Sequence, residues 1–105
     1  MSGRPSLDDI ITAACKVTGV TRAAFLGHDR PAQHVYARQL AAHIAQAHGY
    51  PYPQIGRAFD RKHTTVLRGA RKIEQRLQAG DVGIVATLEQ ARELASSYAS
   101  QRVAA

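Results

Sequence analysis

The sequence has no tryptophan and a single cysteine, Cys15, among its 105 residues. One cysteine cannot form an internal disulfide, and its neighbours Ala14 and Val17 predict a small buried thiol rather than a redox centre. Although tryptophan is absent, 45% of the residues are hydrophobic and alanine is abundant. This composition predicts a core of closely packed helices.

Long apolar runs are also absent. No segment approaches the roughly 20 apolar residues that span a bilayer. The first residues, MSGRPSLDD, lack the apolar stretch of a signal peptide. We therefore expect a cytoplasmic protein that does not enter a membrane. The length fits one domain, which we expect to span 1–105, with an ordered core over 6–100 and short flexible termini.

Acidic residues are scarce, with 8 against 14 lysines and arginines, and the formal net charge is +6. Such a surplus favours a polyanionic partner. Half of the cations lie between Arg57 and Arg76, where only Asp60 and Glu74 oppose them. The chain therefore predicts one basic patch rather than a uniformly basic surface.

Apolar residues recur at helical spacing in six segments, most of them bounded by capping or helix-ending residues. These patterns predict helices over 7–17, 22–26, 32–48, 54–59, 63–78 and 84–100, and no strand. The tail 101–105 is expected to fray. The predicted fold class is all-α, a compact domain of about five to six helices.

Two of these expected helices, 54–59 and 63–78, are separated by a turn of three residues, Asp60, Arg61 and Lys62. A short helix, a tight turn and a longer helix have the spacing of a helix-turn-helix. In that motif the second helix enters the major groove of DNA with its N-terminus first.

The longer helix of this pair has an apolar stripe and a polar face. The stripe, which we expect to be buried, consists of Val66, Ala70, Ile73 and Leu77. Its burial leaves a face for reading DNA that is formed by Thr64, Thr65, Arg68 and Lys72. Threonine offers a hydroxyl and a methyl group to bases, and arginine can bond a guanine edge twice. Taken singly, each residue has a structural explanation in solvation or capping. Together they favour binding of duplex DNA.

The segment from Ile55 to Leu77 resembles a known family. Its sequence, IGRAFDRKHTTVLRGARKIEQRL, is similar to the DNA-binding domain of DnaA, the bacterial chromosomal replication initiator. The segment RQLAAHIAQ, Arg38 to Gln46, is similar to the long helix that precedes it, and the similarity extends from about Leu7 to Ser97. The resemblance implies an all-helical domain that reads DnaA boxes through the major groove and places a basic-loop arginine in the minor groove.

On the recognition helix, the resemblance implies roles for its first residues. His63, Thr64 and Thr65 match residues that reach bases and backbone, and Lys72 matches a phosphate-contacting lysine. Arg68 joins this set because of its place on the exposed face. These positions form the predicted major-groove part of the site.

Outside that helix, Arg38 and Gln39 match a contacting pair on the long helix, and Pro53 matches a phosphate-binding helix start. Arg30 occupies the place of the minor-groove arginine, although by itself it reads equally well as a loop cation beside Asp29. The predicted set is completed by two cations of the turn, Arg61 and Lys62.

The chain departs from the family in this turn. Three residues lie between Phe59 and His63 where the family typically has four, so we expect a slightly different angle for the recognition helix. Lys62 stands where the family has an aspartate that accepts a bond from a base amino group, a contact that a cation cannot make. Lys62 instead favours a phosphate or a guanine acceptor. The loop from Gly27 to Arg30 is poorer in cations than the family's, which predicts a weaker minor-groove anchor.

Other features argue against further chemistry. No GxxxxGK[ST] phosphate loop occurs, so we expect a stand-alone DnaA-like protein without the initiator's nucleotide-dependent activities. The five histidines are not spaced as zinc ligands, and the acidic residues are scattered. We therefore expect no metal, no cofactor and no catalysis. Tyr50 and Tyr52 either stack on bases or staple the next helix to the core, and the staple is favoured.

Three functions fit this pattern. The favoured one is a sequence-specific transcriptional regulator, because Lys62 predicts sites other than an unaltered DnaA box. The second is a modulator of replication initiation that competes for DnaA-type sites. The third is a helical adaptor that binds a protein and attracts DNA unspecifically. The expected partners are duplex DNA and a transcription or replication protein, and the absence of a heptad seam predicts a monomer.

Overall fold

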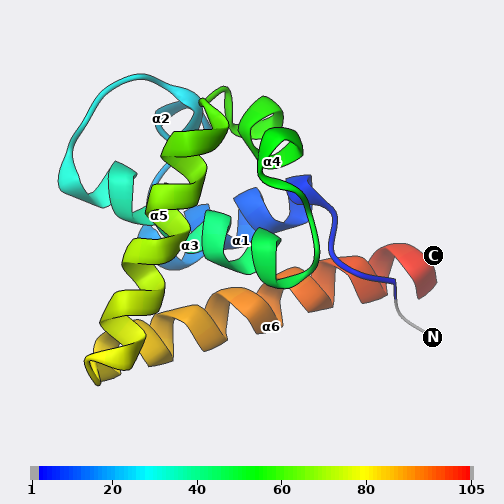
Figure 1. Ribbon diagram of the computed structural model, residues 1–105. Helices are drawn as coiled ribbons and strands as arrows, with labels where there is room; N and C mark the ends of the chain where they lie inside the picture. Colours follow the sequence, from blue (N-terminus) through cyan, green and yellow to red (C-terminus); the bar gives the residue numbers. More distant parts are fainter. Residues whose placement is uncertain (1–2, 105) are drawn as a thin grey trace.

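Helix α3 (Ala32–Ala47) lies at the centre of the structure, a computed structural model that describes residues 3–104, and it contacts all five other helices (Figure 1). Those helices are α1 (Leu7–Thr18), α2 (Arg22–Leu26), α4 (Tyr52–Phe59), α5 (His63–Gln78) and α6 (Val82–Ala104). Residues 3–104 contain no strand. The all-α prediction is confirmed, including the three-residue turn between α4 and α5.

Local capping explains most of the helix boundaries. At the start of α1, the Ser6 hydroxyl accepts a hydrogen bond from the Asp9 N–H, and the Asp9 carboxylate accepts one from the Ser6 N–H, each 3.0 Å long. Gly19 ends this helix with φ +74°, a conformation that side chains with a Cβ disfavour. Helix α4 starts at Tyr52, two residues before the predicted start, because a proline fits within the first turn of a helix.

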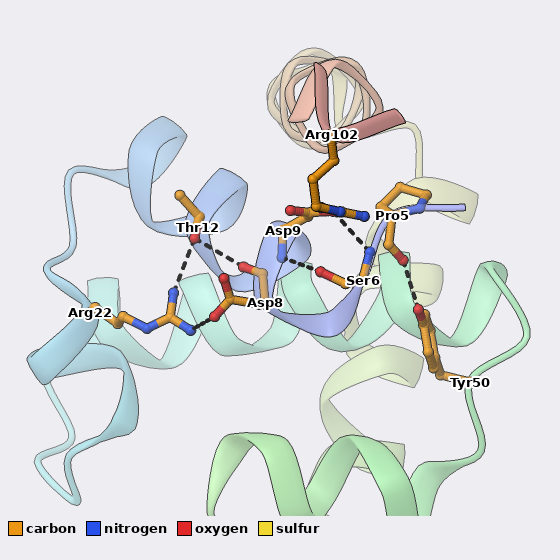
Figure 2. A network of polar contacts seen from close by, with 8 residues as sticks. All are labelled: Pro5, Ser6, Asp8, Asp9, Thr12, Arg22, Tyr50 and Arg102. Atoms are coloured by element: carbon orange, nitrogen blue, oxygen red, sulfur yellow. Dashed lines mark hydrogen bonds and ion pairs between the residues drawn. The ribbon is translucent and has the colours of Figure 1, made fainter. Parts of the chain in front are cut away.

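Helix α6 extends beyond its predicted range at both ends. At its start, the Asp81 carboxylate accepts a hydrogen bond of 3.2 Å from the Ile84 N–H and thereby caps the helix. At its end, the helix continues to Ala104 where the tail was expected to fray, and Arg102 pairs with the carboxylate of Asp9 (Figure 2). The predicted helix end at residue 100 was therefore too early, because this contact joins residues 93 positions apart and lies outside any local pattern. Residue 105 lies outside the described part of the chain.

The N-terminal segment is held against the domain close to the same pair. The Tyr50 hydroxyl donates a hydrogen bond of 2.7 Å to the Pro5 carbonyl (Figure 2), and the guanidinium of Arg4 lies 3.9 Å from the centre of the Tyr50 ring. Tyr50 is buried in the core. It therefore acts as a staple rather than as a platform for nucleic acid bases.

One hydrophobic core holds the helices together. Helix α6 packs mainly against α1, and its buried stripe is formed by Ile84, Leu88, Ala91, Ala95 and Ala99. On another side, Phe25 of α2 and Phe59 of α4 meet edge to face, with ring centres 5.0 Å apart at 81°. Cys15 is buried, as predicted. Although α6 is long, no helix within 3–104 is both long and apolar enough to cross a membrane.

The contact between Asp9 and Arg102 predicts a loss of stability in acid. Burial raises the pKa of Asp9, but hydrogen bonds from Arg102 and Ser6 outweigh it, so this pKa lies below its ordinary value. The resulting stabilisation is complete above about pH 4 and is lost as the pH falls through the lowered folded value. We expect the Tm, measured by circular dichroism, to fall as the pH is lowered through this range. The decline should be shallower in Asp9→Asn, and an identical decline would contradict the assignment.

Candidate nucleic-acid interface

The N-terminal end of α5 is exposed to solvent. Its first residues and the residue before them are all exposed: Lys62, His63, Thr64 and Thr65. In the described structure no side chain caps this helix, and its first turn contains no acidic residue. Free backbone N–H groups and the positive end of the helix dipole therefore face solvent together. Helix α6 lies on the opposite side of the molecule and does not cover this tip (Figure 1).

The buried and exposed faces of α5 agree with the predicted stripe. Val66, Ala70 and Ile73 are buried, and Leu77 is half-buried at the end of the helix. The opposite face carries cations that are exposed: Arg68, Arg71 and Lys72. The helix thus presents one polar face along its length while its apolar face packs on α3.

A groove between α3 and α5, with a volume of about 520 Å³, brings together seven of the eleven predicted residues. They are Arg30, Arg38, Gln39, Arg61, Thr65, Arg68 and Lys72. Five of the seven are cations, and no carboxylate lies among the described residues that line the groove. Gly69 allows the two helices to approach here, because an added Cβ would lie 3.3 Å from Gln39 Cγ. We call this site the α3–α5 groove.

A second hollow on the outside of the turn collects Pro53, Lys62 and His63, together with Arg61, which lines both sites. Thr64 lines neither and stands exposed at the helix tip. The hollow also includes Arg57, which is exposed and was not predicted as a site residue. Its membership of the cation cluster between Arg57 and Arg76 was the signal that could have identified it.

Arg38 has an internal role that the sequence did not predict. Its Nε donates to the Phe25 carbonyl at 2.7 Å, and its Nη2 donates to the carbonyls of Ala24 and Gly27 at 2.9 and 2.8 Å. These bonds satisfy carbonyls at the end of α2, which a helix of five residues cannot satisfy itself. Burial lowers the pKa of Arg38, and the nearby charges of Arg61 and Arg30 lower it further.

Arg61 is likewise bonded to backbone. Its Nη1 donates to the carbonyls of Asp60 at 2.9 Å and Phe59 at 3.3 Å, and its Nη2 donates to Gly27. The remaining predicted cations differ in this respect, because within residues 3–104 their side chains donate no hydrogen bond to backbone and form no ion pair: Arg30, Lys62, Arg68 and Lys72. The acidic residues of the region are occupied elsewhere, as Glu74 binds His43 Nε2 at 3.0 Å and Asp60 lies 3.5 Å from His28. The free positive charge is therefore concentrated around the N-terminal half of α5.

Comparison with known proteins decides the family. Residues 7–73 match the family described as bacterial dnaA protein helix-turn-helix. The chain belongs to this DnaA family. It is 33% identical over 93 residues to chromosomal replication initiator protein DnaA 2 of Chlamydia caviae, covering 87% of this chain and 20% of that protein. It is 37% identical over 94 residues to DnaA of Xanthobacter autotrophicus, covering 88% and 18%. The chain thus spans about a fifth of the length of these curated relatives.

In this member of the DnaA family, the backbone conformation of Asp60 and one hydrogen bond shape the three-residue turn between α4 and α5. Asp60 adopts the left-handed conformation, with φ +54°, at the position that ends α4. The Arg61 N–H then donates to the Gly56 carbonyl at 2.8 Å and closes the turn. Lys62 follows as the residue preceding α5, with its side chain exposed. Its ammonium group is therefore carried at the tip of the recognition helix.

Proposed function

We propose that this chain binds duplex DNA in a sequence-specific manner, with α5 in the major groove and Arg30 in the adjacent minor groove. The observation that carries the proposal is the exposed tip of α5, which lies beside a cationic groove without carboxylates. A phosphate backbone is the polyanion that such an arrangement binds. Membership of the DnaA helix-turn-helix family supports the same conclusion.

The side chains divide into two groups by their chemistry. His63, Thr64, Thr65 and Arg68 lie on the exposed part of α5 nearest to its N-terminus and are assigned to base edges. Lys72 lies about one turn beyond Arg68 and is assigned to a phosphate, as is the start of α4 at Pro53. This division predicts which substitutions change specificity and which weaken all binding equally.

Lys62 supports a target that differs from the DnaA box, and with it a regulatory role. Its exposed ammonium group can bond guanine O6 or N7, or a phosphate, but it cannot accept a bond from a base amino group. Selection of bound sequences from a random duplex pool tests this proposal. We expect an enriched site with guanine at the position that faces Lys62. Enrichment of unaltered DnaA boxes would support competition with the initiator instead, and no enrichment would contradict sequence-specific binding.

Substitutions of Arg68 and Lys72 should separate base reading from phosphate binding. Arg68→Ala should cost about 1–3 kcal/mol on the selected site and less on random duplexes. Lys72→Ala should weaken binding to all duplexes and lower the slope of log affinity against log salt by about one. Fluorescence anisotropy at several salt concentrations measures both effects. Arg92→Ala, which removes an exposed cation from α6, is the matched control, and equal effects of Arg68→Ala on all duplexes would contradict the assignment.

A further inference from the structure

One backbone carbonyl joins three parts of the candidate interface. The carbonyl of Gly27, at the end of α2, accepts a hydrogen bond from Arg38 Nη2 at 2.8 Å and a second from Arg61 Nη2. Arg38 belongs to α3, and Arg61 belongs to the turn before α5. The recognition helix, the central helix and the loop 27–31 are therefore connected at this atom.

The loop 27–31 carries Arg30, and its other connections to the turn are weak. His28 and Asp60 approach to 3.5 Å, but their side chains are 78% and 77% exposed, so water screens this pair. Arg38 also donates to the Asp29 carbonyl at 3.3 Å, which holds the loop to α3 but not to the turn. Among the described contacts, the half-buried guanidinium of Arg61 is the strongest connection between this loop and the helix-turn-helix.

The geometry of the Arg61 side chain limits its capacity to bind DNA. Three of its N–H bonds point at the carbonyls of Gly27, Phe59 and Asp60. A guanidinium has five donors in a fixed plane, so these bonds fix its orientation. An exposed cation of the same helix-turn-helix, such as Arg57, carries no such constraint.

We propose that Arg61 is a positioning residue, which locks the loop bearing Arg30 to the helix-turn-helix turn and so fixes the spacing between the major-groove and minor-groove contacts. This inference rests on the proposed function for its DNA-reading part. Lysine cannot replace arginine in this role, because a single ammonium group does not reproduce a planar fork that bonds both sides of the junction. A phosphate contact, in contrast, depends mainly on charge and tolerates lysine.

The first experiment needs no DNA. Backbone ¹⁵N relaxation order parameters of residues 27–30 are compared in the full chain, Arg61→Lys, Arg61→Ala and the control Arg57→Ala, after thermal unfolding has established that each variant is folded. We expect the order parameters of the loop to fall from about 0.85, the value of a rigid backbone, to below about 0.6 in both Arg61 variants, and to stay unchanged in the control, because the loop loses its connection to the turn. Unchanged order parameters in Arg61→Ala would overturn the proposal.

The second experiment measures binding to the selected site with A·T-rich and with G·C-rich flanks. A narrow A·T-rich minor groove attracts arginine, so Arg30→Ala should abolish the preference for that flank. Arg61→Lys and Arg61→Ala should both lose the same preference, and the double variant Arg30→Ala, Arg61→Ala should bind no more weakly than the weaker single variant. Two results would identify Arg61 as a direct phosphate contact and overturn the inference. In the first, the affinity losses of the two single variants add in the double variant and the Arg61 variants retain the flank preference. In the second, Arg61→Lys binds DNA as tightly as the unaltered chain. Equal binding of the unaltered chain to every duplex would instead overturn the proposed function, while the backbone order parameters still decide whether Arg61 holds the loop.

Discussion

Replacing Phe59 with alanine is expected to lower the free energy of unfolding by about 3–5 kcal/mol. Phe59 ends α4, is 1% exposed, and packs its ring 5.0 Å from that of Phe25 in an edge-to-face arrangement. Truncation would remove this aromatic contact and leave a cavity beneath the α3–α5 groove, where Phe59 is also a lining residue. Because small domains unfold with about 5–15 kcal/mol in total, much of the stability would be lost.

Urea denaturation followed by circular dichroism measures this loss. Phe59→Leu is the matched control, since it keeps an apolar side chain in the site and should cost clearly less than the truncation to alanine. The folded fraction of Phe59→Ala should also lose DNA affinity. Without the contact between α2 and α4, the loop 27–31 and the turn between α4 and α5 are no longer held at a fixed distance. A loss below about 1.5 kcal/mol for Phe59→Ala would contradict the view that this pair ties α2 to α4.

Local sequence patterns predicted the helices because their determinants are local. Helix α5 was predicted with its observed limits, since its apolar stripe lies within the segment and Gly80 follows shortly after its end. The end of α6 was missed for the opposite reason. Arg102 is held by Asp9, which lies at the other end of the chain, and no spacing rule within the last helix contains that partner.

In the candidate site, too, the features set by local sequence were predicted and those set by distant contacts were not. The exposed tip at Thr64 and the cation at Lys72 follow from the helical period once Val66 and Ile73 are taken as buried. The internal bonds of Arg38 and Arg61 do not follow from any period, because they depend on three segments that meet at one carbonyl. Side-chain type alone cannot distinguish an arginine that binds DNA from one that binds backbone.

The junction between α4 and α5 depends on the absence of a side chain at position 56. Gly56 is buried in α4, and an added Cβ would lie 2.6 Å from the Arg61 carbonyl oxygen and 3.3 Å from the His63 nitrogen. Both neighbours are backbone atoms of the turn, so neither can rotate away. The Gly56 carbonyl also accepts the bond from the Arg61 N–H that closes the turn. A methyl group at this position must therefore push α5 away from α4.

We accordingly expect Gly56→Ala to destabilise the domain by about 3 kcal/mol, the upper end of the cost of overpacking, and to lower affinity for the selected site at least tenfold in the folded fraction. Gly69→Ala is the matched control for stability, because it adds the same methyl group to the neighbouring helix, where its nearest contact at 3.3 Å is the flexible Gln39 side chain. It is not a control for affinity, since Gly69 lines the α3–α5 groove. Both substitutions gain about 1 kcal/mol of helix propensity, so urea denaturation of the two variants compares the contact with the turn against the contact with Gln39. Anisotropy titration compares the affinity of Gly56→Ala with that of the unaltered chain. Equal stability of the two variants, together with unaltered affinity of Gly56→Ala, would mean that the close approach at Gly56 does not determine where α5 enters the DNA.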